Sequence, residues 1–236
     1  MTDAWTQVVR HHVGLGRMLP LGRPEDGAWI AEDAAGAVLR GAAADGLPGV
    51  RLGALRIGLA DPQRVAEPVV PAPPSALPPG ALRVTADFAA TAVEPLPATA
   101  ERVRELLATA AAERLGLVVT EVDLRITELL EPDGRLVEVR PPRPPAARET
   151  TDLSELRAAE AALAVPGVVR LTGPGRAVRI EERTDGTAAL AHRHVRVDLA
   201  ADATHRTVEV ARRVRAVVRD ALEDRPTVAV LVTSVG

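Results

Sequence analysis

The chain lacks cysteine and lysine altogether, and its only aromatic residues are Trp5, Trp29 and Phe88. Without cysteine it has no disulfide framework, no thiolate metal site and no cysteine nucleophile. All 29 basic residues are therefore arginine. Because only three aromatic side chains are present, we expect a core of Val, Leu, Ile and Ala, and few rings on which nucleic-acid bases could stack.

Long apolar runs are also missing. No segment approaches the roughly 18 consecutive apolar residues that span a bilayer, and the N-terminus shows no basic leader followed by an apolar core. We therefore expect a cytoplasmic chain without direct membrane insertion. The formal net charge is −3, so no overall field attracts the chain to nucleic acid or to an anionic membrane.

The sequence does contain a repeated phrase: GLPGVRLGALRIGL at 46–59 is similar to AVPGVVRLTGPGRAVRI at 164–180. The matched pieces lie 118 positions apart at Pro-Gly-Val, 123 at ALRI and AVRI, 111 at AERVRELL and ARRVRAVV, and 106 at VDLRIT and VAVLVT. The offset changes only in expected loops, which tolerate insertions better than packed elements do. Chance similarity between two Ala- and Val-rich segments is the alternative, but the shared order and spacing favour one unit folded twice.

Periodicity predicts the elements of both units. We expect a helix over 3–13 ahead of the units. In the first unit we expect helices over 31–44 and 100–116, the last capped by Thr99, and strands over 50–59, 82–93 and 117–129. Residues 61–80 are too rich in proline for a sheet or helix and predict an extended, mobile loop. In the second we expect helices over 153–164 and 205–222 and strands over 177–183, 190–200 and 227–235. Hairpin turns are predicted at Asp133–Gly134 and Asp185–Gly186.

These elements predict an α+β fold made of two tandem αββαβ repeats, each a small mixed sheet with helices on one face. The expected divisions are an N-terminal helical segment at 1–25, a first repeat at 26–140, a Pro/Arg linker at 141–152 and a second repeat at 153–236. Small sheets leave edges that must be covered. The strand at 227–235 is apolar on both faces, so we expect it to be sandwiched, with the other copy or a second chain as its cover.

The pattern resembles the alkaline shock protein, or envelope stress response, family. In the first repeat the likeness is carried by Gly49, Val50, Val103, Leu107, Gly116, Leu117, Val122 and Leu124; in the second by Gly167, Val168, Val214, Val218, Val228 and Val230. The resemblance implies a non-enzymatic cytoplasmic protein that self-associates and is held near the membrane by a membrane-anchored partner. The duplication in one chain and the proline-rich loop depart from the family pattern.

One candidate site is a group of histidines. HRHVRVD at 192–198 places His192, His194, Arg196 and Asp198 on one face of an expected strand. His192 and His194 could share a metal ion, with His205 as a third ligand, or could make a contact sensitive to pH. A solvated strand face is the favoured interpretation, because Arg196 in the same row would repel a cation. We therefore expect no metal.

A second candidate is a row of arginines, Arg212, Arg215 and Arg219, at spacings of three and four on the expected helix 205–222. The row could meet phosphate, lipid headgroups or acidic protein. A solvated helix face, partly neutralised by nearby carboxylates, is favoured.

No catalytic or cofactor site emerges from the sequence. The glycines of GLG at 14–16 and GPG at 173–175 do not have the spacing of phosphate-binding loops. Ser75, Ser154 and Ser234 stand in a loop, at a helix start and in the last residues, with no expected base beside them. We therefore expect neither an enzyme nor a bound cofactor.

The sequence thus favours an interaction or scaffold protein of the envelope stress type, with self-association or protein partners and without nucleic acid. The alternatives left open are a nucleic-acid-binding module that uses the arginine row, and a metal- or pH-responsive regulator that uses the His192 and His194 face.

Overall fold

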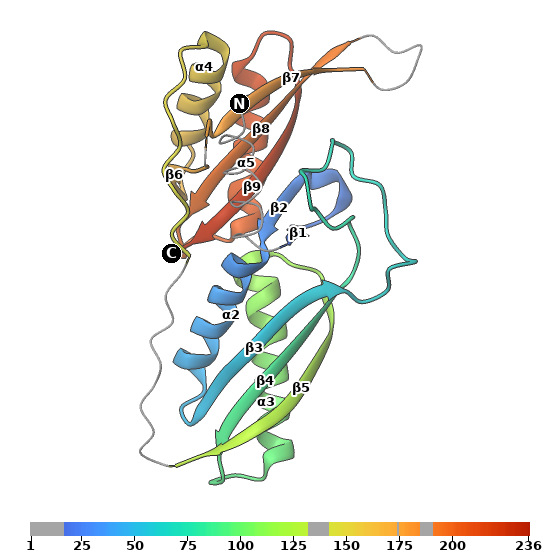
Figure 1. Ribbon diagram of the computed structural model, residues 1–236, viewed down its shortest axis with the longest axis vertical. Helices are drawn as coiled ribbons and strands as arrows, with labels where there is room; N and C mark the ends of the chain where they lie inside the picture. Colours follow the sequence, from blue (N-terminus) through green and yellow to red (C-terminus); the bar gives the residue numbers. More distant parts are fainter. Residues whose placement is uncertain (1–16, 132–141, 174, 185–190) are drawn as a thin grey trace, which may run out of the picture.

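The computed structural model describes residues 17–131, 142–173, 175–184 and 191–236. Within them the chain is an α+β protein with four α-helices and two mixed β-sheets, one of six strands and one of three. Figure 1 shows the two sheets one above the other along the long axis of the molecule. Each sheet contributes one large, fully buried aromatic side chain, Trp29 in the six-stranded sheet and Phe88 in the three-stranded sheet. The prediction of an α+β fold is confirmed.

The N-terminal half supplies the three-stranded sheet and two helices. Its elements are β1 (Met18–Pro20), the 3-10 turn η1 (Pro24–Asp26), β2 (Ala28–Ala31), α2 (Glu32–Gly46), β3 (Val50–Leu59), β4 (Leu82–Thr91), α3 (Leu96–Ala110), the π-helical turn η2 (Ala111–Leu115) and β5 (Val119–Leu130). The helix at α3 begins earlier than expected. Thr99 is not its cap but a buried residue of the first turns, because Pro95 already occupies the N-cap position. Gly116, with φ +90°, ends the helical segment as predicted.

The C-terminal half supplies most of the six-stranded sheet and the other two helices. Its elements are α4 (Leu153–Leu163), β6 (Val168–Leu171), β7 (Val178–Arg183), β8 (His192–Ala201), α5 (Thr207–Ala221) and β9 (Thr227–Val235). Strand β6 is an element that the periodicity does not predict separately. Both predicted hairpin turns, at 133–134 and 185–186, lie outside the described residues.

The two halves share a pairing pattern. In the three-stranded sheet, β3 is antiparallel to β4, and β4 is parallel to β5. In the six-stranded sheet, β6 and β7 are both antiparallel to β8, and β8 is parallel to β9. A parallel pair needs a crossover, which α3 provides in one half and α5 in the other.

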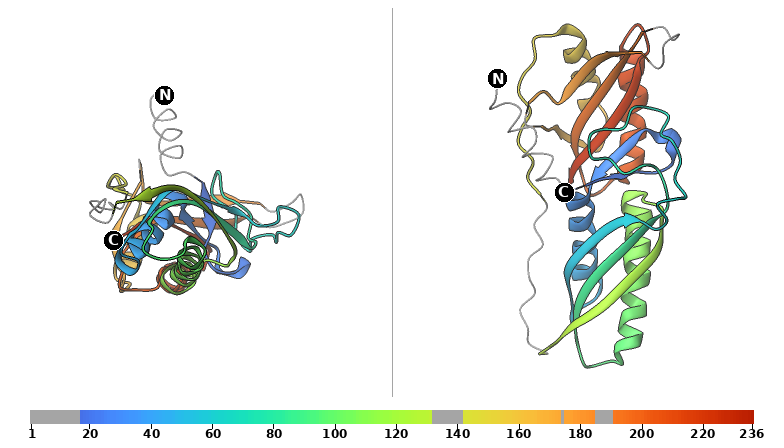
Figure 2. Two further views of the ribbon diagram at one scale, coloured as in Figure 1. Left: turned by 90° about the horizontal axis from the view of Figure 1, so that it is seen from below. Right: turned by 45° about the vertical axis from the view of Figure 1, so that its right-hand side comes forward.

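Helices cover one face of each sheet (Figure 2). Helix α2 packs against β3 and α3, and α3 against β5; in the other half α5 packs against β9 and α4. The buried stripes of the crossover helices explain this arrangement, since Val103 and Leu107 of α3, and Val214 and Val218 of α5, are fully buried. In Figure 1, α3 lies below α5.

The N-terminal segment behaves differently from the prediction. The expected helix at 3–13 lies outside the described residues, but Met18–Pro20, inside the expected helical segment 1–25, forms strand β1. Strand β2 then pairs parallel with β9, with Ile30 opposite Val232. The N-terminal strands therefore complete the sheet of the C-terminal half. Strand β9 is consequently an inner strand, with β8 on one edge and β2 on the other, and every residue from Val228 to Val235 is buried, as expected for a strand apolar on both faces.

Residues 61–80 form no helix and no strand beyond isolated bridges, as predicted, but part of this loop packs on the strand pair. The backbone N–H of Met18 donates to the carbonyl of Ser75 at 3.3 Å, and that of Leu77 to the carbonyl of Met18 at 2.8 Å. Trp29 Nε1 donates to the Leu77 carbonyl at 3.4 Å, and Val70 is buried. These contacts fix the loop's middle against the sheet.

Part of the expected Pro/Arg linker at 141–152 makes hydrogen bonds with the C-terminal half. The carbonyl of Pro145 accepts from the N–H of Gly173 at 3.1 Å, and that of Pro144 from Arg170 Nη2 at 2.9 Å. Asp152 caps α4 by accepting from the N–H groups of Ser154 and Glu155. Among the described residues, no helix is both long and apolar enough to cross a membrane.

Candidate functional site

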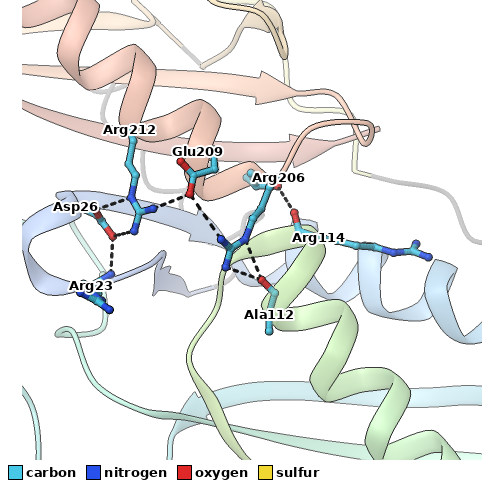
Figure 3. A network of polar contacts seen from close by, with 8 residues as sticks. Arg23, Asp26, Ala112, Arg114, Arg206, Glu209 and Arg212 are labelled. Carbon is cyan, nitrogen blue, oxygen red and sulfur yellow. Dashed lines mark hydrogen bonds and ion pairs between the residues drawn. The ribbon is translucent and has the colours of Figure 1, made fainter.

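The arginine row of α5 is used inside the molecule. Arg212 Nε and Nη2 donate to the two carboxylate oxygens of Asp26, both at 2.8 Å, and Arg212 Nη1 donates to Glu209 at 2.7 Å (Figure 3). Arg215 donates to the carbonyl of Glu25. Arg219 reaches its neighbour Asp220 at 3.3 Å. Two of the three arginines therefore hold η1, which joins β1 to β2, against α5.

Asp26 is built to receive this guanidinium. Its side chain is 10% exposed, and its Oδ2 also accepts from the backbone N–H of Arg23 at 2.7 Å. Burial alone would raise the pKa of Asp26, but the hydrogen bonds from Arg212 and Arg23 outweigh it and lower that pKa. The carboxylate is thus held ionised against α5, and the same pair raises the pKa of Arg212.

Just before the row, Arg206 joins the two crossover helices end to end. Its Nε and Nη2 donate to the Ala112 carbonyl at 3.1 and 3.0 Å, and the Thr207 hydroxyl donates to the Arg114 carbonyl at 3.4 Å. These carbonyls belong to η2, the C-terminal end of the helix that begins with α3. A cation at a helix C-terminus satisfies orphan carbonyls and the helix dipole together. Figure 3 shows this end facing the N-terminus of α5.

Two glycines of the N-terminal half allow α5 to pack closely against it. A Cβ on Gly116 would lie 2.3 Å from Cγ1 of Val208, and one on Gly22 would lie 2.8 Å from Cγ2 of the same valine. Both glycines have positive φ, +90° and +84°, so they meet a conformational and a steric requirement at once. Val208, in the first turn of α5, is 1% exposed between them.

The predicted arginine site is therefore mainly an internal joint between the halves. Both faces of the Arg212 fork are occupied by carboxylates, and burial lowers the pKa of Arg215. A phosphate or lipid headgroup would have to displace Asp26. Sequence reasoning missed Asp26 because it lies 186 positions from Arg212. The local signal was its place between Pro24 and Gly27, which are residues typical of turns.

The histidines do not gather into one group. His192 and His194 lie at the start of β8, whereas His205 follows the end of that strand. Seven residues of strand separate His194 from Ala201, about 23 Å at 3.3 Å per residue. His205 instead pairs through Nδ1 with Asp202 at 2.9 Å. Hydrogen bonds from His205 and Thr204 lower the pKa of Asp202 to about 2. Within the described ranges, no three His, Asp or Glu side chains are placed to hold a metal ion.

The histidine face of β8 is also less exposed to solvent than predicted. His194 is 5% exposed and its Nδ1 lies 2.8 Å from the Thr227 hydroxyl. Burial, aided by the charge of Arg183, lowers the pKa of His194 to about 4. Asp198 is 2% exposed and paired in a two-bond contact with Arg196, at 3.0 and 3.1 Å.

The expectation of a solvated face failed because the alternation of polar and apolar residues shows which side chains share a face, but not what covers that face. A polar row can be buried when its members pair with one another, as Arg196 and Asp198 do.

The three serines lie apart in the fold. Ser75 is in the proline-rich loop, Ser154 is in the first turn of α4 and Ser234 is near the end of β9. No protein-family model matches the chain, and no curated protein matches it significantly.

Proposed function

We propose that this chain is a non-enzymatic interaction or scaffold protein of the envelope stress type, built from two copies of an αββαβ unit. In this proposal it works in the cytoplasm, self-associates, and is held near the membrane by an anchored partner. It binds no cofactor.

Strand register supports the two-copy part of the proposal. Ile57 pairs with Val84 and Val84 with Val122; Ile180 pairs with Val195 and Val195 with Val228. The matched positions differ by 123, 111 and 106, which are the offsets found in the sequence. Because a register slip would change the face of every side chain, chance does not readily produce agreement in three strands.

The turn before the first strand supports it as well. Gly49 and Gly167 both have positive φ, +84° and +94°. The Gly49 carbonyl accepts from the Thr91 N–H, and the Gly167 carbonyl from the Asp202 N–H, each at 2.9 Å. Thr91 and Asp202 differ by the same 111 positions as β4 and β8. Each half therefore makes the same hydrogen bond, which joins the end of its strand β4 or β8 to its glycine turn.

The observation that carries the interaction role is strand addition at β9. Strand β2, from the other half, pairs with β9 on the side away from β8. The matching side of β5 has no strand beside it among the described residues, and β5 ends the three-stranded sheet. An open edge next to exposed Ile126 and Leu129, 39% and 58% exposed, is a template for association.

The two alternatives receive less support. A nucleic-acid site on α5 would need Arg212, which Asp26 already holds. A metal-binding regulator on the His192 and His194 face would gain no third ligand from His205, because β8 separates His205 from that face.

Light scattering coupled to size-exclusion chromatography, run over a hundredfold range of chain concentration with and without heparin, tests the proposal. We expect molar mass to rise with concentration, without retention by heparin. A monomer at every concentration would contradict self-association. Salt-sensitive binding to heparin would favour the nucleic-acid alternative, and a rise in melting temperature with zinc would favour the metal alternative.

A further inference from the structure

We propose that the open edge of β5 pairs, antiparallel, with the same edge of a second copy of this chain, with Leu124 opposite Leu124. This rests on the proposed self-association and names the surface and the partner that carry it. The result would be a continuous six-stranded sheet across a two-fold axis.

The straight part of β5 sets the length of the pairing. Relative to β4, extra residues stand in β5 at Thr120 and Thr127, where the register shifts. Bulges interrupt a ladder and bend the strand away from partners. The uninterrupted run is Glu121–Ile126, and its residues 122–126 are symmetric about Leu124. A self-pairing strand can therefore use this whole stretch on each side.

Charge decides the register within this run. On the outer face Glu121, Asp123 and Arg125 follow one another. With Leu124 opposite itself, Asp123 faces Arg125 of the second copy twice. Moving the centre to 123 would place Asp123 opposite Asp123, although Glu121 would then face Arg125 twice, and moving it to 125 would place Arg125 opposite Arg125; only the register centred on 124 has no like-charged pair. Like charges directly opposite destabilise a strand pair, so one register of the three is favoured.

The charged pair is already held over the sheet. Arg125 donates to both carboxylate oxygens of Asp87 on β4, each at 2.9 Å, and Asp123 lies 3.6 Å from Arg83. These contacts orient the two side chains over the outer face of the sheet, while 75% of Arg125 and 62% of Asp123 stay exposed and can also pair with groups of the second copy.

The other face supplies apolar contact. Val122 is buried, Leu124 is half-buried and Ile126 is 39% exposed. In this register Val122 lies opposite Ile126, so Leu124 and Ile126 both lose contact with water. The carbonyl of Val122 accepts from Arg104 Nε of α3 at 3.1 Å. Pairing would replace this side-chain donor with a backbone N–H.

A mixing experiment on the full chain tests the register. Arg125→Glu places a carboxylate opposite Asp123 of the second copy, and Asp123→Arg places a guanidinium opposite Arg125, so each variant should dimerise more weakly than the wild type. Mixed together, both contacts become opposite in charge. We expect the mixture to dimerise about tenfold more tightly than either variant alone, measured by light scattering.

The control is a matched pair away from β5, Asp45→Arg and Arg213→Glu, both at exposed positions. These changes alter net charge equally, and mixing them should give no gain. An equal gain in the control mixture, or none in the β5 mixture, would overturn the β5 pairing.

Disulfide crosslinking gives a second test of the register of the β5 pairing, and this test does not depend on charge. The chain has no cysteine, so Leu124→Cys introduces a single thiol opposite itself, which oxidation should link into a disulfide dimer. In Thr120→Cys the two thiols would stand about 27 Å apart, roughly eight residues along the strand, and should not link. Equal linking of both variants would overturn the register. If the wild-type chain stays monomeric, the proposed self-association is wrong as well. If it self-associates but neither the mixing nor the crosslinking result is seen, only the proposed pairing of β5 is wrong.

Discussion

At the scale of single residues, the arginines of α5 use their guanidinium groups for contacts inside the chain rather than for an external anion. A row of guanidinium groups on one helix face is typical of phosphate or acidic-peptide binding. Here Arg212 finds its carboxylate within the chain, at Asp26, and Arg206 finds helix carbonyls at η2. The residue type and spacing allowed an anionic partner, although a solvated helix face was the favoured interpretation. Only the fold shows that the partner is the chain itself.

His194 makes stability depend on pH in a defined direction. Its pKa in the folded chain is about 4, below the ordinary 6.5, so between these values the unfolded chain binds a proton that the folded chain does not. Stability is therefore complete above pH 6.5 and falls as the pH drops towards 4. We expect a loss of about 2–3 kcal/mol between about pH 7.5 and 4.5 from this group.

Urea unfolding of the wild type and of His194→Gln at both pH values measures this loss. The variant should lose less stability on acidification, by about that amount. His205→Gln keeps His194 and serves as the control, and it should keep the loss of stability on acidification that comes from His194. An identical pH dependence in His194→Gln and wild type would show that His194 titrates normally.

At the scale of elements, the two glycine turns are the clearest matched pair. Gly49→Ala would bring a Cβ to 2.8 Å from Thr91 Oγ1, and Gly167→Ala to 2.6 Å from Val210 Cγ2. Because both glycines have positive φ, we expect each substitution to lower the free energy of unfolding by about 1–3 kcal/mol.

Gly41 is the control for that prediction. It lies inside α2 with no atom within 4 Å of an added Cβ, so Gly41→Ala should raise stability by about 0.5–1 kcal/mol. Denaturant unfolding followed by circular dichroism compares the three. If Gly49→Ala and Gly41→Ala had effects of the same sign, the turn would not need glycine.

The elements that could be predicted from the sequence are the long ones with a clear period. Strand β3 occupies the expected 50–59, β9 the expected 227–235, and α5 lies within the expected 205–222. Strands β1, β2 and β6 have three or four residues each, too few for alternation to show. They form because partners distant in the sequence supply their hydrogen bonds.

The candidate sites were less predictable than the fold. Period-two spacing placed His194, Arg196 and Asp198 on one face, but it gave no indication that His194 and Asp198 are buried. Helical spacing placed Arg212 and Arg215 together, but it gave no indication that η1 lies against them. Local pattern reports which residues share a face, and tertiary packing decides what that face meets.

At the scale of the whole molecule, the joint between the halves predicts one cooperative unit. Strand β2 lies in the sheet of the C-terminal half, and Arg206 and Arg212 bind elements of the N-terminal half. We therefore expect a single calorimetric transition in the wild type, with equal calorimetric and van't Hoff enthalpies. In Arg206→Ala/Arg212→Ala, the two halves should melt in separate steps.

Arg213→Ala/Arg219→Ala changes the same number of arginines on the same helix at exposed positions and should keep the single transition. Two transitions in the wild type would mean that the joint is too weak to couple the halves.

The parallel pairing of β2 with β9 also sets an order of events during synthesis. Ile30 meets Val232 only after about two hundred further residues have been made, roughly 10–40 s at the usual rate of about 5–20 residues per second. Throughout that interval the apolar segment Ala28–Ala31 is without its partner strand β9, which has not yet been synthesised. The nascent chain is thus exposed to premature partners for most of its own translation.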